Sequence, residues 1–286
     1  MGTNGYVEYL AGNAPVIITA PHGGTLAPSS IPDRTAERCG GSATTTTDLN
    51  TAALARTMRQ RYFARFGKYP HVVIAHLARR KLDANRTNPE ASCGIAAADV
   101  ALREWHAFID AAKRSVLQTS GKGWYMDMHG HGHAVQRLEI GYLVSGRQLD
   151  LSDAELNAQR NIADASSIRT IARGSPATFA SVLRGPTSLG TLYANNAFPA
   201  VPSAQDPGPK GAAYFSAGDN TRRHTCGGEA SPFGGTTDGM ICGVQIESNY
   251  TGVRDTEANR TRFADVTAVV LERFLAEHWG LRLRAP

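Results

Sequence analysis

The chain has 286 residues, of which 42% are hydrophobic, and a formal net charge of +5. This length allows one large α/β domain or two small ones, and because no shift in composition marks a boundary, we expect a single domain, residues 1–286. The basic residues are scattered as single and paired arginines, which argues against nucleic-acid binding, and no apolar run reaches the roughly 18 to 20 residues of a membrane span.

The cysteines leave the cellular compartment open. Cys39, Cys93, Cys226 and Cys242 have no CxxC spacing, so they do not indicate a structural zinc cluster. Two disulfides in an oxidising compartment and four reduced thiols both fit this pattern. The first residues do not resemble a signal peptide, although a mature chain would look the same. We therefore expect a secreted or periplasmic protein if the cysteines are paired, and a cytoplasmic one otherwise.

The first predicted strand leads to a histidine. Residues 16–20 form a short, β-branched, apolar run that is typical of a buried parallel strand. The run ends in Pro21-His22-Gly23-Gly24, which places His22 at the carboxyl end of the strand, where open α/β sheets bind ligands. A long loop, residues 25–47, follows. Helical spacing of apolar residues then predicts a helix from near Asp48 to Phe66, in which Asp48 is also a candidate N-cap.

A concentrated basic segment follows the next predicted strand, residues 71–77. Four basic residues and one carboxylate lie within residues 79–86, namely Arg79, Arg80, Lys81, Asp83 and Arg86. At the end of a buried strand this composition predicts an anion-binding segment, although a solvated charge run is the alternative. A helix is expected from about 97 to 118.

Three histidines alternate with glycine after the apolar run 124–128. In an extended strand, residues two apart share a face, so His129, His131 and His133 are expected to face one site if the glycines do not bend the chain. Imidazole is a common ligand of zinc-like metals, and Asp127 is placed to orient a ring from behind. We expect Asp127 and His131 to support the metal ligands. The alternative is a polar strand end with hydrogen-bonded histidines.

The last third of the chain completes the predicted fold. We expect a strand over 138–144, a helix from a capping box at Ser152 and Glu155 to about 173, and a Gly/Pro-rich loop insertion over about 174–240 that walls the site. A strand over 241–250 carries Glu247, and a terminal helix covers 256–277. The alternation of strands and helices predicts a three-layer α/β/α fold with a central mixed, largely parallel sheet.

Five short motifs together resemble a known family. They occur in order over residues 15–275 and are Pro21-His22-Gly23-Gly24, Thr47-Asp48, Asp83-Ala84-Asn85-Arg86, Asp127-Met128-His129-Gly130 and Gln245-Ile246-Glu247. This series resembles the N-formylglutamate amidohydrolase family and, more distantly, the zinc carboxypeptidases and aspartoacylases. The resemblance implies a zinc carboxypeptidase-like (phosphorylase/hydrolase-like) fold.

The resemblance also implies a set of metal ligands. One Zn²⁺ per chain would be held by His22, Asp48 and His129, with Asp33 as the reserve acidic ligand. Two histidines and a carboxylate leave a fourth position for water. The sequence departs from the carboxypeptidase pattern because no glutamate follows three residues after His22.

The resemblance finally implies roles for four further residues. Asn85 and Arg86 would bind the carboxylate of the substrate, Arg79 would polarise the scissile carbonyl, and Glu247 would be the general base and acid. These roles predict a zinc-dependent amidohydrolase that acts on a linear amide, an N-acyl amino acid or a similar small or peptide-like molecule with a carboxylate. The alternatives are a carboxypeptidase-like metallopeptidase and a non-catalytic binding protein with the same fold.

Overall fold

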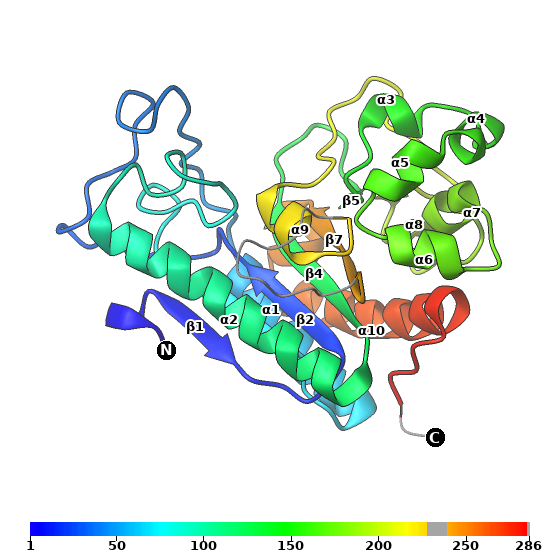
Figure 1. The fold of residues 1–286 in the computed structure, drawn as a ribbon, viewed down its shortest axis with the longest axis horizontal. Helices are drawn as coiled ribbons and strands as arrows, with labels where there is room; N and C mark the ends of the chain where they lie inside the picture. Colours follow the sequence, from blue (N-terminus) through cyan, green and yellow to red (C-terminus); the bar gives the residue numbers. More distant parts are fainter. Residues whose placement is uncertain (228–238, 285–286) are drawn as a thin grey trace.

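A seven-stranded sheet forms the centre of the computed structural model, which describes residues 1–227 and 239–284 (Figure 1). The strands lie in the order β1-β3-β2-β4-β7-β5-β6. The neighbours among β3, β2, β4 and β7 are parallel, as are β5 and β6, whereas β1 is antiparallel to β3 and β5 is antiparallel to β7. The predicted mixed, largely parallel sheet is therefore confirmed. The bounds are β1 (Val7–Leu10), β2 (Val16–Ala20), β3 (His71–Ala75), β4 (Gly123–Gly130), β5 (Leu138–Gly141), β6 (Ala200–Val201) and β7 (Ile241–Ser248).

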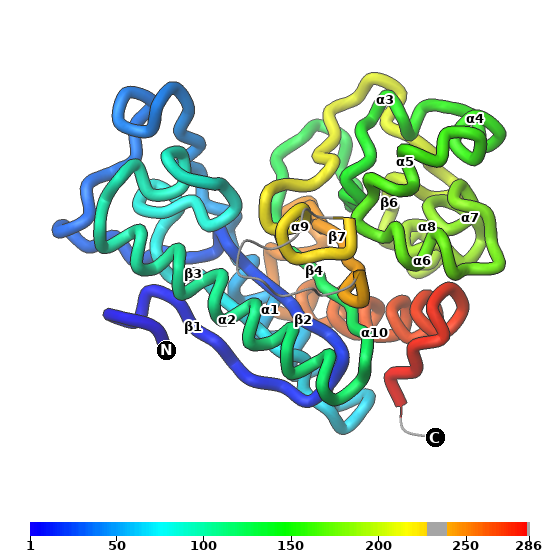
Figure 2. The backbone as a smooth tube through the Cα atoms, viewed as in Figure 1, coloured from blue at the N-terminus to red at the C-terminus, as the bar shows by residue number. Residues whose placement is uncertain are grey.

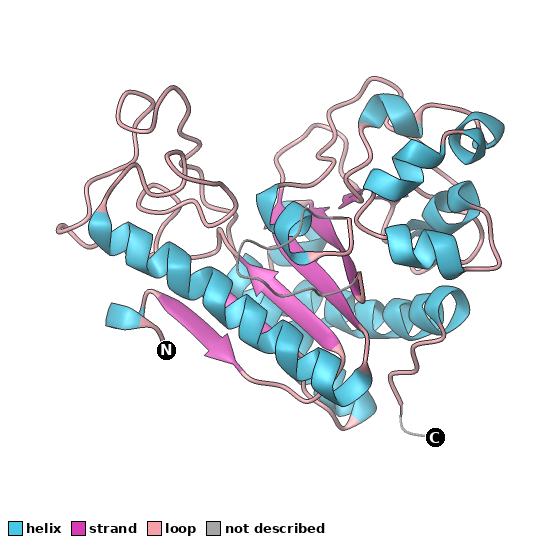
Figure 3. Ribbon diagram, viewed as in Figure 1, coloured by secondary structure: helices cyan, strands magenta, loops and turns pink. Residues whose placement is uncertain are grey.

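Long helices cover both faces of the sheet. Helix α2 (Ala96–Ser120) lies in front of it in Figure 3, and α1 (Thr51–Phe66) and α10 (Glu257–Trp279) pack together behind it. The strands supply both interfaces because successive side chains point to opposite faces. Val16 and Ile18 of β2 belong to the core beneath α1 and α10, whereas Ile17 belongs to the core beneath α2. The three-layer α/β/α architecture is confirmed.

Short helices gather beside the β5 and β6 edge of the sheet (Figure 2). They are α3 (Gly146–Leu149), α4 (Asp153–Ala158), α5 (Arg160–Ala165), α6 (Arg169–Gly174), α7 (Phe179–Arg184) and α8 (Leu189–Ala194). Helix α9 (Asp219–His224) packs against β4 and β7. Two helical turns, η1 (Thr3–Gly5) and η2 (Tyr250–Arg254), complete the described elements.

The single helix predicted after Ser152 is wrong in its length. The capping box of Ser152 and Glu155 is present, but the chain leaves the helical conformation at Gln159, with φ −93° and ψ 77°. The short helices α4, α5 and α6 replace the long one, and each buries an apolar side chain, Leu156, Ile162 and Ile171. A straight helix would not turn all three side chains into the core beside the sheet.

The expectation of little regular structure over 174–240 is also wrong where this segment is described. It contains α7, α8, β6 and α9. Some of its polar residues are helix caps, since the side chains of Thr178 and Ser188 each accept a hydrogen bond from the first turn of the helix that follows. Residues 228–238 of the segment lie outside the described residues. Strand β1 was not predicted from the sequence, and β5 ends before the predicted residue 144 because Leu143 has a φ of 62°.

Two disulfides join loops to each other and to the sheet. Cys39 is bonded to Cys93, and Cys226 to Cys242 at the start of β7. The cysteines are therefore paired, one of the two arrangements that the sequence left open. Within residues 1–227 and 239–284, no helix combines the length and the apolar character needed to cross a membrane.

We predict that both bridges stabilise the fold. Cross-links 54 and 16 residues apart restrict the unfolded chain, so replacing the pair Cys39 and Cys93 by serine should lower the free energy of unfolding by about 4 kcal/mol, and replacing Cys226 and Cys242 by about 3 kcal/mol. Urea unfolding without reductant measures both effects. A double variant that unfolds at the wild-type urea concentration would show that its bridge does not stabilise the protein.

Candidate metal centre

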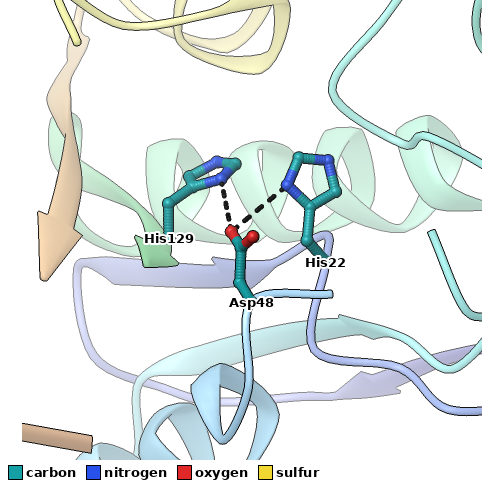
Figure 4. A group of neighbouring side chains, drawn as sticks. All are labelled: His22, Asp48 and His129. Atoms are coloured by element: carbon teal, nitrogen blue, oxygen red, sulfur yellow. Dashed lines mark hydrogen bonds and ion pairs between the residues drawn. The ribbon is translucent and has the colours of Figure 1, made fainter. Parts of the chain in front are cut away.

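Three buried side chains meet at the carboxyl ends of β2 and β4. His22 follows β2, His129 lies near the end of β4, and Asp48 precedes α1. The Asp48 Oδ2 atom lies 3.3 Å from His22 Nδ1 and 3.2 Å from His129 Nδ1 (Figure 4). Because β2 and β4 pair in parallel, their carboxyl ends bring both histidines to the same edge of the sheet. The structure thus brings together the three residues predicted to bind a metal.

The backbone around Asp48 holds its carboxylate in this position. The Asp48 amide donates to the His22 carbonyl at 3.0 Å, and the Gly130 amide donates to Asp48 Oδ2 at 3.2 Å. Gly23 allows the loop to lie against α1, since a Cβ there would be 2.5 Å from the Ala52 nitrogen. The N-cap of α1 is Asn50, so Asp48 does not have the capping role that was its alternative. Asp33, the reserve ligand, lies elsewhere and pairs with Lys81 at 2.7 Å.

A second carboxylate supports each histidine ring. His22 Nε2 lies 2.6 Å from Asp83 Oδ1, and His129 Nε2 lies 2.9 Å from Asp127 Oδ2. Asp127 and His129 are two residues apart on β4 and so share a face of the sheet. When these carboxylates accept the Nε2 protons, both Nδ1 atoms turn their lone pairs toward Asp48, the arrangement found behind metal-bound histidines.

The donor set and its spacing fit a tetrahedral metal such as zinc. Ligands at zinc distances of about 2.0 to 2.1 Å lie about 3.3 to 3.4 Å apart. The observed separations of 3.3 and 3.2 Å are close to that value. Three electron-rich atoms this close together are stable only around a proton or a cation. Burial alone would lower the pKa of His129, but the carboxylates of Asp127 and Asp48 favour its charged form and raise the pKa well above its usual value.

Asp83 connects this cluster to the basic segment. Its carboxylate is fully buried and, besides His22, accepts hydrogen bonds from Arg79 Nε at 2.9 Å and the Asn85 amide at 3.0 Å. Arg34 Nη1 lies 3.8 Å from Asp83 Oδ2, the same oxygen that Arg79 binds. Burial alone would raise the pKa of Asp83, but His22 and the two arginines hold it well below its usual value. The contact of Asp83 with His22 was not predicted from the sequence. The place of Asp83 four residues after Arg79 was a signal that these two side chains could pair.

Three residues of this part of the chain, Arg79, Asn85 and Arg86, line a cavity beside the cluster. Arg79 is held by Asp83 and also lies 3.6 Å from Asp48 through Nη1. The Asn85 Oδ1 atom accepts the Asn220 amide at 2.8 Å, so this side chain ties the basic segment to α9. Arg86 is partly exposed at the mouth, where its Nη1 donates to the Asn85 carbonyl at 2.9 Å.

Glu247 lies beside the cluster on the next strand. It is opposite His129 in the register of β4 and β7, and its Oε1 atom is 4.0 Å from His129 Nδ1. Gln245 Nε2 donates to the same oxygen at 2.8 Å. Burial raises the pKa of Glu247 to about 7, although His129 opposes this rise. A carboxylate with this pKa can both accept and donate a proton near neutral pH.

These side chains surround a cavity of about 200 Å³. Its volume suits a small polar molecule. Three residues from the segment predicted to wall the site contribute to it. The lining residues are His22, Thr44, Asp48, Arg79, Asn85, Arg86, His129, Gly130, Phe215, Ala217, Gly218, Gln245 and Glu247.

The other two histidines of the alternating run do not join the three-residue cluster. Strand β4 ends at Gly130, so the two-residue periodicity stops before them. His131 bonds through Nε2 to the Arg137 carbonyl at 2.7 Å, and His133 Nδ1 lies 2.8 Å from Glu139 Oε1. The expectation that all three histidines face one site is therefore wrong. The structure places His131 against Arg137 and His133, with no hydrogen bond to a residue of the cluster among its described contacts.

Comparison with known proteins supports the fold. No model of a protein family matches the sequence, and no curated protein matches it. The crystal structure of N-formylglutamate amidohydrolase from Ralstonia eutropha matches with a TM-score of 0.52 and 12% identity, over 96% of this chain and 99% of that chain. A gene product from Agrobacterium tumefaciens has a TM-score of 0.48 and 14% identity, over 94% of each chain. The match to N-formylglutamate amidohydrolase agrees with the α/β/α architecture of the chain. The fold of the chain resembles that of N-formylglutamate amidohydrolase, as the motifs predicted.

We predict that His22→Ala and His129→Ala each lose bound zinc, because either change removes one of three converging donors. His133→Ala is the matched control, since its ring hydrogen-bonds to Glu139 outside the cluster. Zinc content after dialysis, measured by atomic emission on folded protein, compares the three variants. Full zinc occupancy in both the His22 and the His129 variants would show that the ligands are different residues.

Proposed function

We propose that the protein is a zinc-dependent hydrolase that cleaves the C–N bond of an N-acyl amino acid or a similar amide with a carboxylate. One observation carries this proposal. Two carboxylate-supported histidines and Asp48 converge at zinc-like spacing, with Glu247 4.0 Å from His129 in the same cavity. Three protein donors leave a coordination position open, which distinguishes hydrolytic from structural zinc sites. The fold shared with N-formylglutamate amidohydrolase supports an amidohydrolase over a carboxypeptidase-like metallopeptidase or a non-catalytic binding protein.

His22, Asp48 and His129 would hold the zinc. When bound, zinc lowers the pKa of a coordinated water toward 7 and polarises a carbonyl group. Asp83 and Asp127 keep the two rings in the tautomer that offers Nδ1, so the chain presents its ligands already oriented.

Glu247 is the proposed general base and acid. It accepts the proton of the attacking water and passes it to the departing nitrogen, which requires a carboxylate close to the cluster but not bound within it. Its raised pKa suits both steps. Arg79 lies beside Asp48 with a permanently charged guanidinium, which can stabilise the negative charge that develops on the carbonyl oxygen without transferring a proton.

Arg86 and Asn85 are the proposed carboxylate anchors of the substrate. Arg86 lies at the mouth of the cavity, and its planar guanidinium can bind a carboxylate through two parallel hydrogen bonds. Its ion pair with Glu90 is long, at 3.5 Å, and exposed, so a substrate carboxylate can replace it at little cost. The backbone carbonyl of Asn85 accepts a hydrogen bond from Arg86 Nη1 and so orients the guanidinium.

We also propose that the protein works in an oxidising compartment, secreted or periplasmic. Both cysteine pairs are bonded, and disulfides persist where thiols are not kept reduced.

Glu247→Gln should bind zinc and substrate but lower kcat by about a hundredfold or more, because glutamine keeps the shape of the side chain and cannot accept the proton. Glu277→Gln, an exposed change in α10, should behave like the wild type. Steady-state kinetics on an N-acyl amino acid, with zinc content checked, tests this. Near-normal kcat in the zinc-loaded Glu247 variant would exclude the role, and loss of its zinc would make Glu247 a ligand.

Arg86→Lys should chiefly raise KM for amides that carry a carboxylate, because lysine makes a point contact where arginine makes two parallel hydrogen bonds. Arg80→Lys is the matched control, as Arg80 belongs to the same basic segment but pairs with Asp33. Wild-type protein that hydrolyses an N-acyl amino acid and its methyl ester with equal kcat/KM would remove the basis for this anchor.

A further inference from the structure

An exposed aromatic ring lines the cavity of the metal cluster. Phe215 is 45% exposed, unlike most large apolar side chains of the chain. Its backbone is nevertheless fixed, since its amide donates to Glu139 Oε2 at 2.8 Å. The flanking residues are also tied to β5 and the loop after it, because Tyr214 Oη donates to the Ile140 carbonyl and the Leu143 amide donates to the Ser216 carbonyl, both at 2.8 Å. The chain around Phe215 is therefore held in place, and its ring is exposed in the lining of the cavity, which is typical of a ligand contact.

A histidine ring supports Phe215 from behind. The rings of His133 and Phe215 stack with centroids 4.7 Å apart and planes 19° apart. The buried Glu139 carboxylate orients the His133 ring, with Oε1 2.8 Å from His133 Nδ1, and anchors the Phe215 backbone, whose amide donates to Oε2. Both oxygens of one carboxylate therefore hold this pair, which we call the aromatic wall.

Hydrogen bonds account for the close approach of His131, His133 and Glu139 better than a second metal site would. Nitrogen and oxygen atoms of His131, His133 and Glu139 lie within 4.8 Å of one another, as in a metal site. However, His131 Nε2 bonds to the Arg137 carbonyl and its Nδ1 accepts the His133 amide at 3.1 Å. The 2.8 Å between His133 and Glu139 is a hydrogen-bond length, shorter than the 3.2 and 3.3 Å of the metal cluster. These donors and acceptors already satisfy one another.

The strand order places the wall at one end of the site. His129 on β4 is opposite Glu247 on β7, which is opposite Glu139 on β5. Residues directly opposite on neighbouring strands share a face, so these side chains form a row that ends at the wall. Arg86 comes from the loop after β3, on the other side of β2 and β4. A substrate with its carboxylate at Arg86 and its scissile carbonyl at the metal cluster would extend its acyl group along the row.

We infer that the aromatic wall of Phe215 and His133 binds the acyl group, and that the substrates of this protein carry a flat aromatic or extended apolar acyl group in place of formyl. The inference rests on the proposed function and specifies its substrate class. An aryl or alkyl group buries apolar surface against the Phe215 ring, whereas a formyl group has almost none to bury.

Two amides of the same amino acid test the inference, N-benzoylglycine and N-formylglycine, with zinc-loaded full-length protein. The wild type should prefer the benzoyl compound by about tenfold or more in kcat/KM, the scale of an added apolar contact in a pocket. Phe215→Ala should lower this ratio by about tenfold, and His133→Ala by less, because the Phe215 ring remains but loses its support. Phe63→Ala is the matched control, since Phe63 is also exposed and stacked, on Tyr69, away from the cavity.

Equilibrium binding separates this inference from the proposed function. Calorimetry with the zinc-loaded Glu247→Gln protein compares both amides without turnover, with and without Phe215→Ala. If both amides are hydrolysed and Phe215→Ala does not change the ratio of their kcat/KM values, the role of the aromatic wall is overturned, while the proposed amidohydrolase activity stands. If neither amide is hydrolysed, the proposed function fails. The aromatic wall would still be supported if N-benzoylglycine binds more tightly than N-formylglycine and Phe215→Ala removes this difference. Equal binding of both amides without hydrolysis would overturn both.

Discussion

The convergence of two imidazole nitrogens on one buried carboxylate oxygen is the constraint around which the site is built. Two imidazole nitrogens lie 3.2 and 3.3 Å from one carboxylate oxygen in a buried position. Such an arrangement persists only if the rings cannot turn away, and Asp83 and Asp127 prevent this by binding the opposite nitrogen of each ring. Asp83 is itself a buried charge, which is costly unless paired. Arg79 and Arg34 supply the pairing, so the basic segment is part of the same electrostatic unit.

Arg34 shows how irregular loops form a fixed wall around the cluster. Its buried guanidinium donates to the carbonyls of Thr44, Arg79 and Glu90, which belong to separate loop segments. The bond between Cys39 and Cys93 joins the first of these segments to the last. A long loop without helices or strands has few backbone hydrogen bonds of its own, and here a side chain and a covalent bond replace them. This explains how Thr44 and Arg86 are held at the cavity.

The mixed sheet gives the site two unlike halves. Parallel strands bring the ends of β2 and β4 together, which collects the proposed ligands from distant parts of the chain. The antiparallel strand β5 then adds Glu139 beside Glu247, and Glu139 binds the His133 ring and the Phe215 backbone amide. The proposed chemistry therefore lies on the parallel strands β2, β4 and β7, and the inferred contact with an apolar acyl group lies beside β5.

The sequence by itself determined the strands β2, β3, β4 and β7, the helices α1, α2 and α10, and the grouping of His22, Asp48 and His129 as candidate ligands. Apolar periodicity and turn residues are local signals, and the motif order added the rest. Only the tertiary structure shows that Asp48 lies beside both histidines whereas Asp33 pairs with Lys81, because this depends on which carboxylate the folded chain brings to the histidines. It also separated His131 and His133 from His129, since the end of β4 at Gly130 is set by pairing with β7. The support from Asp83 and the stacking of Phe215 on His133 join residues 61 and 82 positions apart, and contacts at such separations leave no periodic signal in a single sequence.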